Sequence, residues 1–286
     1  MRFLPFLALL AVLSAACTNS GSAETTTTLA PSTTTTTEAS DTPACLSGEL
    51  PFVEEGTVAA LDSQGRDARA IAGVRWDPFE GCERVKIEFL SATGAPATRI
   101  GPVGISMLAD SGIVRVNLSD AIVESAVADS TLNGTLVDKW FVVEDSEDGL
   151  TVDLHLNERA AARAFTTTSP ARLVIDLRGT GDDRPLATPL SVGGIVLLSP
   201  QAGVGLYPLQ VNGYAAPEVD AVRLRLTDSV DITVDRAVST LSSTHVWRAF
   251  SAALNDGPSG SVLLLIGTAN ESGEPIFGIE VPLDLP

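Results

Sequence analysis

The sequence predicts an all-β protein with two β-sandwich domains, and three observations carry this prediction. Apolar and polar residues alternate with period two in several short stretches, including 84–89 and 150–156. Residues that favour turns separate these stretches. A helical pattern is scarce, and the alanine-rich segment 157–164 is the best short candidate for a helix. Period-two alternation places one set of side chains in a core and the other in water, which is typical of half-buried antiparallel strands.

The N-terminal segment has the pattern of an export signal. Arg2 precedes an uncharged run from Phe3 to Ala16, which closes with small residues directly before Cys17. The pattern resembles the lipobox of bacterial lipoproteins, although Ser14 stands where such motifs usually carry Leu. The run is shorter than the roughly 20 residues that a membrane-crossing helix needs. We therefore predict a lipoprotein signal peptide at 1–16 and lipidation of Cys17, with an ordinary secretory peptide as the alternative.

Residues 17–44 are predicted to form a disordered, threonine-rich linker. Eleven of the 27 residues from 18 to 44 are threonine, and the segment has almost nothing apolar to bury. Such a chain cannot offset the entropy of ordering and should stay extended. We expect it to hold the folded part away from the membrane that anchors Cys17, with the protein facing the cell wall.

Charge and cysteine content fit the same location. The chain carries 36 acidic and 18 basic residues, a formal net charge of −18, so we expect no nucleic-acid partner. With Cys17 lipidated, Cys45 and Cys82 are the remaining cysteines. An oxidising compartment would let them pair, and two unpaired buried thiols are the alternative.

The region 45–180 is predicted to be the first sandwich. A hairpin is expected where Asp148 and Gly149 separate the stretches 139–144 and 150–156, because Asp-Gly supplies the positive φ of a tight turn. This region has three other motifs. They are Val74-Arg75-Trp76 followed by Phe79, the alternating run Arg84 to Phe89, and Phe165 followed by the run Ser169 to Leu177. In their order these motifs resemble the AMIN-like domains of exported bacterial lipoproteins. The resemblance implies a β-sandwich and localisation at the cell wall.

A turn-rich, charged segment from Gly179 to Pro189 predicts a domain junction, and strand patterns resume after it. Trp247 and Phe250 are the large candidates for the core of the second sandwich, at 191–286. The motifs of this region are Ile195 to Pro200, Leu209 to Ala215, Trp247 to Leu254, Gly260 to Ile266 and Ile279 to Leu283. Together they resemble the immunoglobulin-like domain of spore-germination and sporulation lipoproteins, which implies an exported, non-catalytic module.

The sequence lacks the usual catalytic and metal-binding motifs, so we predict no enzyme and no catalytic, cofactor-binding or metal-binding residues. His155 and His245 are 90 positions apart, and no Gly-x-Ser-x-Gly nucleophile motif occurs. His155 lies in an alternating stretch, where we expect it on the surface. The acidic segment 144–148 lacks the spacing of calcium ligands and is expected to be a solvated hairpin tip.

The sequence therefore predicts a non-catalytic, lipid-anchored binding or scaffolding protein of the bacterial envelope, with peptidoglycan as a candidate ligand. The alternative is an interaction module that recruits or regulates an envelope enzyme or a complex of the germination or sporulation type. Stacking candidates for a ligand are Trp76, Trp140, Phe141, Tyr207 and Tyr214.

Overall fold

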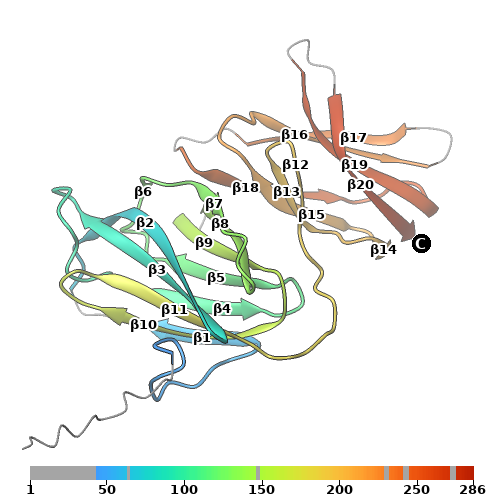
Figure 1. The fold of residues 1–286 in the computed structure, drawn as a ribbon. Coiled ribbons are helices and arrows are strands. Elements are labelled where there is room, and N and C mark those ends of the chain that lie inside the picture. Colours follow the sequence, from blue (N-terminus) through green and yellow to red (C-terminus); the bar gives the residue numbers. More distant parts are fainter. Residues whose placement is uncertain (1–42, 63–64, 146–148, 229–231, 241–244, 271–274) are drawn as a thin grey trace, which may run out of the picture. The chain divides into compact units, whose positions relative to one another are not determined.

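The computed structural model describes residues 43–286, apart from 63–64, 146–148, 229–231, 241–244 and 271–274 (Figure 1). Over these residues the regular elements are all β-strands, so the predicted all-β class is confirmed. The predicted signal peptide, Cys17 and nearly all of the predicted linker lie outside the described residues. Within the described part, no helix is both long and apolar enough to span a membrane.

The strands form three sheets, which we call the N-terminal, shared and C-terminal sheets. The N-terminal sheet has the order β10 (Ala160–Thr167), β11 (Arg172–Gly179), β3 (Cys82–Ser91), β2 (Ala68–Phe79) and β6 (Glu124–Ser125). The shared sheet has the order β1 (Gly56–Leu61), β4 (Val103–Leu108), β5 (Ile113–Leu118), β9 (Gly149–Leu156), β8 (Val137–Asp145), β18 (Trp247–Leu254), β15 (Leu209–Ala215), β13 (Ile195–Ser199) and β12 (Leu190–Val192), and β7 (Asp129–Thr131) also pairs with β8. The C-terminal sheet has the order β14 (Gly203–Val204), β20 (Pro275–Leu285), β19 (Gly260–Ala269), β16 (Ala221–Thr227) and β17 (Ile232–Ser239).

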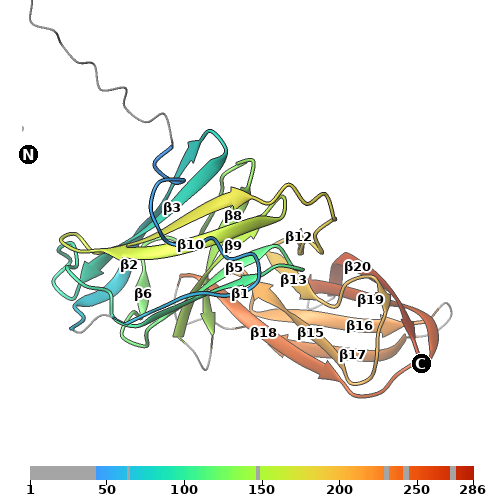
Figure 2. The ribbon, with the colours of Figure 1, turned by 90° about the horizontal axis from the view of Figure 1, so that it is seen from below.

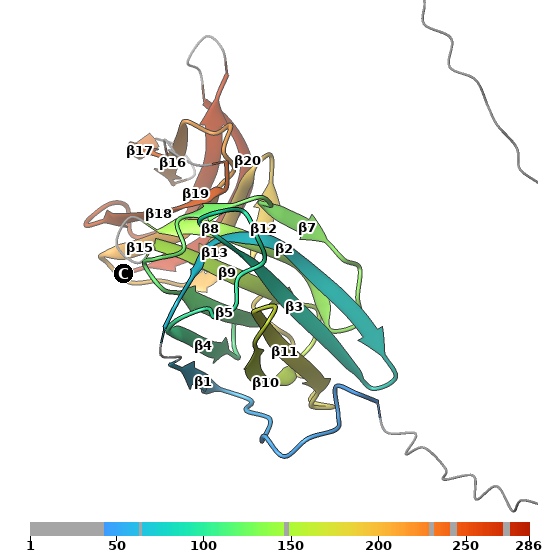
Figure 3. The same ribbon diagram turned by 90° about the vertical axis from the view of Figure 1, so that its left-hand side faces the viewer.

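Two hydrophobic cores lie between these sheets. The first core fills the space between the N-terminal sheet and the β1-to-β8 part of the shared sheet, a two-layer arrangement that Figure 3 shows. The second core lies between the C-terminal sheet and the β18-to-β12 part of the shared sheet. Trp247 and Phe250 are buried in the second core, as the sequence predicted. Each core with its two layers is called a sandwich below.

The sandwiches are joined by more than the connecting chain. β8 and β18 pair in parallel through Trp247 with Val143 and Arg248 with Glu144, which makes the shared sheet continuous. Phe141 and Val143 belong to strand β8 yet pack into the second core. The connecting residues 180–189 have no regular structure.

The alternating stretches form the predicted strands, while the predicted helix at 157–164 is wrong. β8 and β9 form the expected hairpin, with Asp145 opposite Gly149 and a φ of 80° at Gly149. Residues 160–164 instead begin β10, which pairs with β11 along its whole length and whose outer edge lies beside β1 (Figure 2). The alanines of this stretch are buried, and their small side chains suit a tightly packed strand, so tertiary packing overrides their helix propensity.

Candidate functional site

The predicted disulfide between Cys45 and Cys82 is present, with Cα atoms 6.2 Å apart. Both cysteines are buried, and Cys82 begins strand β3. The bond closes a loop with a sequence separation of 37. In the loop-entropy model a loop of this length stabilises the fold by about 3 to 4 kcal/mol. The disulfide therefore attaches the start of the described chain to the N-terminal sheet.

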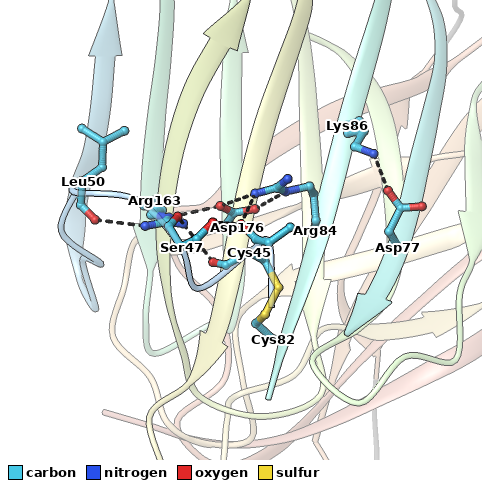
Figure 4. A network of polar contacts seen from close by, with 10 residues as sticks. Cys45, Ser47, Leu50, Asp77, Cys82, Arg84, Lys86, Arg163 and Asp176 are labelled. Carbon is cyan, nitrogen blue, oxygen red and sulfur yellow. Dashed lines mark hydrogen bonds and ion pairs between the residues drawn. A yellow bond between two sulfur atoms is a disulfide. The ribbon is translucent and has the colours of Figure 1, made fainter. Parts of the chain in front are cut away.

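Arg163 fastens the same segment through hydrogen bonds (Figure 4). Its guanidinium donates to the carbonyl oxygens of Cys45 at 3.0 Å, Gly48 at 3.3 Å and Leu50 at 3.5 Å, and also to that of Ser47. The Arg163 side chain is 4% exposed, so water does not compete for these donors. We call residues 45–50 the fastened segment.

Asp176 compensates the charge of the buried arginine. Its carboxylate is fully buried and accepts from Arg163 Nε at 3.1 Å and from Arg84 Nε and Nη2 at 2.6 and 3.0 Å. Arg84 Nη2 also donates to the carbonyl oxygen of Ala44 at 2.8 Å. Charge-assisted, bidentate contacts of this kind are the arrangement that makes a buried charge tolerable. This network is structural in character, because its donors are directed at the protein's own backbone.

A groove of about 450 Å³ lies between the two sandwiches and is the candidate binding site. One wall comes from β5, β8, β9 and the β4–β5 turn, and the other from β13, β15 and β18. Among the described lining residues, Arg115 and Asp145 are the charged ones. Most polar lining residues instead carry a hydroxyl or an amide: Ser111, Asn117, Thr151, Ser199, Asn212, Tyr214 and Ser251.

Three polar side chains link the two walls of the groove. Arg115, on β5, forms a bidentate ion pair with the fully buried carboxylate of Asp153 on β9, at 2.7 Å from Nη2 and 3.0 Å from Nε. Tyr214, on β15, donates its hydroxyl to Asp153 and accepts from Arg115 Nη2 at 2.9 Å. The hydrogen bond to Asp153 raises the pKa of Arg115, whereas burial and the Asp153 charge raise that of Tyr214 well above its ordinary value. Arg115 therefore stays charged and Tyr214 stays protonated.

His155 is buried, so the expectation that it lies on the surface is wrong. His155 is 4% exposed, and its ring packs edge to face with the ring of Phe141, with the ring centroids 5.0 Å apart. The period-two pattern correctly separates the two faces of β9, but the face with His155 and Asp153 is covered by Tyr214 and Phe141 rather than by water. Burial lowers the pKa of His155 to about 4, so this imidazole is neutral at neutral pH.

The aromatic candidates for ligand stacking are mostly packed inside the protein. Trp140, Phe141 and Tyr214 are 3%, 4% and 3% exposed. Trp76 donates its indole N–H to the buried carboxylate of Glu83 at 2.8 Å, and Tyr207 donates to the carbonyl oxygen of Pro258 at 2.9 Å. Sequence reasoning missed the groove because its walls come from strands of both sandwiches.

Over the described ranges, no group of three or more metal-ligating side chains comes together. The tip of the acidic hairpin, 146–148, lies outside the described residues. No family model, no curated protein and no solved structure matches this chain.

Proposed function

We propose that this chain is a non-catalytic binding or scaffolding protein of the bacterial envelope, held at the membrane by a lipid on Cys17 and facing the cell wall. The observation that supports export best is the disulfide between Cys45 and Cys82. Structural disulfides persist in oxidising compartments and are rare in the cytosol. Peptidoglycan is the proposed ligand, and the AMIN-like and immunoglobulin-like resemblances of the two regions support an envelope role.

The anchor is tested by comparing the full chain with Cys17→Ser after expression in a bacterial host. The wild-type chain should begin at Cys17, carry an acyl mass and incorporate labelled palmitate, whereas Cys17→Ser should incorporate none. Recovery of the uncut wild-type chain from the cytosol without acyl mass would contradict the proposal.

Ligand binding is tested by sedimentation of the detergent-purified full chain with purified cell wall. The proposal expects retention on peptidoglycan comparable to that of an established wall-binding protein, because a wall scaffold must bind its matrix directly. An unrelated lipoprotein in the same detergent is the control for nonspecific retention. Absence of retention, with the positive control retained, would contradict wall binding.

A protein partner is the second candidate, and an exposed apolar loop favours it. Val204 and Leu206 are 86% and 69% exposed, and they lie in and beside β14, at the edge of the C-terminal sheet. Exposed apolar side chains next to a strand edge are typical of interaction surfaces. Crosslinking in membranes should then give one dominant protein partner, and Val204→Asp with Leu206→Asp should remove it.

A further inference from the structure

We propose that the groove between the two sandwiches binds an uncharged glycan segment with N-acetylated sugars. This inference rests on the proposed envelope function and assigns a site and a ligand class to it. The groove volume of about 450 Å³ is within the range of small-ligand sites, about 300 to 1,000 Å³.

At β5 and β15 the groove favours recognition by side chains. β5 is paired on one side with β4 and on the other with β9, and β15 lies between β13 and β18. Their backbone donors and acceptors are therefore used in the sheet. A peptide that binds by adding a strand needs a free sheet edge, which these internal strands do not offer.

The side chains of the groove match sugar chemistry. Hydroxyls and carboxamides both donate and accept hydrogen bonds, as sugar hydroxyls and acetamido groups do. Asn117 lines the groove from the β5 wall, and Ser251 and Asn212 line it from the other wall, where they are register partners on β18 and β15. The lining also contains two apolar side chains, Leu108 and Ala249, and Leu108 is 36% exposed. These side chains would contact the methyl group of an acetamido substituent.

Charge argues against an anion as the main ligand. The positive charge of Arg115 is balanced by the buried carboxylate of Asp153, and the acidic residue Asp145 also lines the groove. The chain as a whole carries a formal charge of −18. A neutral ligand avoids the repulsion that an anion would meet here.

The groove is held in shape before any ligand arrives. Arg115, Asp153 and Tyr214 join its two walls, and Asn212 Nδ2 donates to Ser199 Oγ at 2.9 Å, which orients the amide. Gly213 is needed beside Asn212, because a Cβ atom there would collide with the carbonyl oxygen of Val196 and the ring of Phe250. Preorganised polar groups lose less entropy when they bind.

The test measures binding of the N-acetylglucosamine tetramer to the full detergent-purified chain by calorimetry. Asn117→Ala should weaken binding about 3- to 10-fold, the loss expected for one hydrogen bond. Asn255→Ala is the matched control, since Asn255 is exposed outside the groove. Ser251→Trp should abolish binding by filling the groove, whereas Ser239→Trp, at an exposed position of β17, should leave it unchanged.

Comparison probes separate this inference from the proposed function. The glucose tetramer lacks acetamido groups and should bind at least 10-fold more weakly; equal binding would overturn the N-acetyl assignment. The stem peptide of peptidoglycan, without its glycan, is the second probe. If it binds the wild-type chain and Ser251→Trp abolishes that binding too, the glycan assignment is overturned. If the wild-type and Ser251→Trp chains are retained equally on cell wall, the groove is overturned while wall binding stands. If neither is retained, both proposals fail.

Discussion

At the scale of single residues, two buried titratable side chains lie on one face of β9. Asp153 and His155 both point to that face, and both are buried. Asp153 forms a bidentate pair with Arg115, whereas His155 is neutral at neutral pH. One strand thus buries a carboxylate paired with an arginine and an uncharged imidazole two positions apart.

His155 should make stability depend on pH. Burial lowers its pKa, Asp153 and Asp138 oppose this, and Lys139 and Arg115 add to it, leaving a value of about 4. Because the unfolded imidazole titrates near 6.5, the unfolded state binds more protons between these values, and stability falls as pH drops. From pH 7.5 to 4.5, urea unfolding should show wild type losing about 2 to 3 kcal/mol more than His155→Leu. Equal losses would contradict a buried, neutral His155.

Arg163 should be necessary for the order of the fastened segment. Arg163→Lys keeps the charge but loses the planar fork that reaches several carbonyl oxygens, and it weakens the pair with buried Asp176. We expect a loss of about 3 kcal/mol in unfolding free energy and faster amide exchange at residues 45–50. Arg172→Lys is the control, since Arg172 is 40% exposed and pairs with Glu88 at the surface. It should cost less than about 1 kcal/mol.

At the scale of elements, the junction between the sandwiches depends on two strands of the second sandwich, β18 and β15, which contact β8 and β9 of the first. β18 adds to β8 through two residue pairs, and β15 sends Tyr214 across to β9. The rings of Phe141 and Trp247 meet edge to face with their centroids 4.8 Å apart, and Trp247 donates its indole N–H to Asp129 at 2.6 Å. Side-chain contacts therefore join the two sandwiches in addition to the short strand pairing.

Removing one hydroxyl tests this view of the junction. Tyr214→Phe leaves the ring in place but deprives buried Asp153 of a donor, so we expect a loss of about 1 to 3 kcal/mol in unfolding free energy. Tyr207→Phe is the matched control, because its hydroxyl bonds within the second sandwich and the residue is only partly buried. Chemical denaturation of both variants gives the comparison. Equal effects would show that Tyr214 has no special role between the sandwiches.

Strands and their inward faces could be predicted from the sequence, but the contacts between sandwiches could not. Val85, Ile87 and Phe89 alternate with polar residues and are buried as the pattern indicates. Alternation says which residues share a face, and it does not say what covers that face. The cover of Asp153 is Tyr214, 61 positions further along the chain, and no local pattern connects them.

At the scale of the whole described chain, two cores share one sheet. Phe141 and Val143 place side chains of the first sandwich's hairpin in the second core, and Val246 joins the first core from just before β18. The connecting segment is also held to the first sandwich, since Leu186 packs against its core and Ala187 N donates to the carbonyl oxygen of Asp110 at 3.0 Å. Unfolding of one sandwich therefore exposes apolar surface of the other.

This coupling predicts one cooperative unfolding transition for the two sandwiches. Differential scanning calorimetry of the full chain should give one peak, with a calorimetric enthalpy close to the van't Hoff enthalpy. Tyr214→Phe should shift that peak to lower temperature without splitting it. Two resolved peaks in the wild-type protein would show that the sandwiches unfold independently.

The disulfide also decides where a mechanical load would enter the protein. A pull on the backbone preceding Cys45 reaches β3 through Cys82, and β3 lies between β2 and β11 with antiparallel ladders to both. Extracting an internal strand requires both ladders to rupture together, whereas an outer strand can be peeled away one rung at a time. Tension from the N-terminal side would thus be shared by the centre of the N-terminal sheet, which would suit the attachment through Cys17 that we propose.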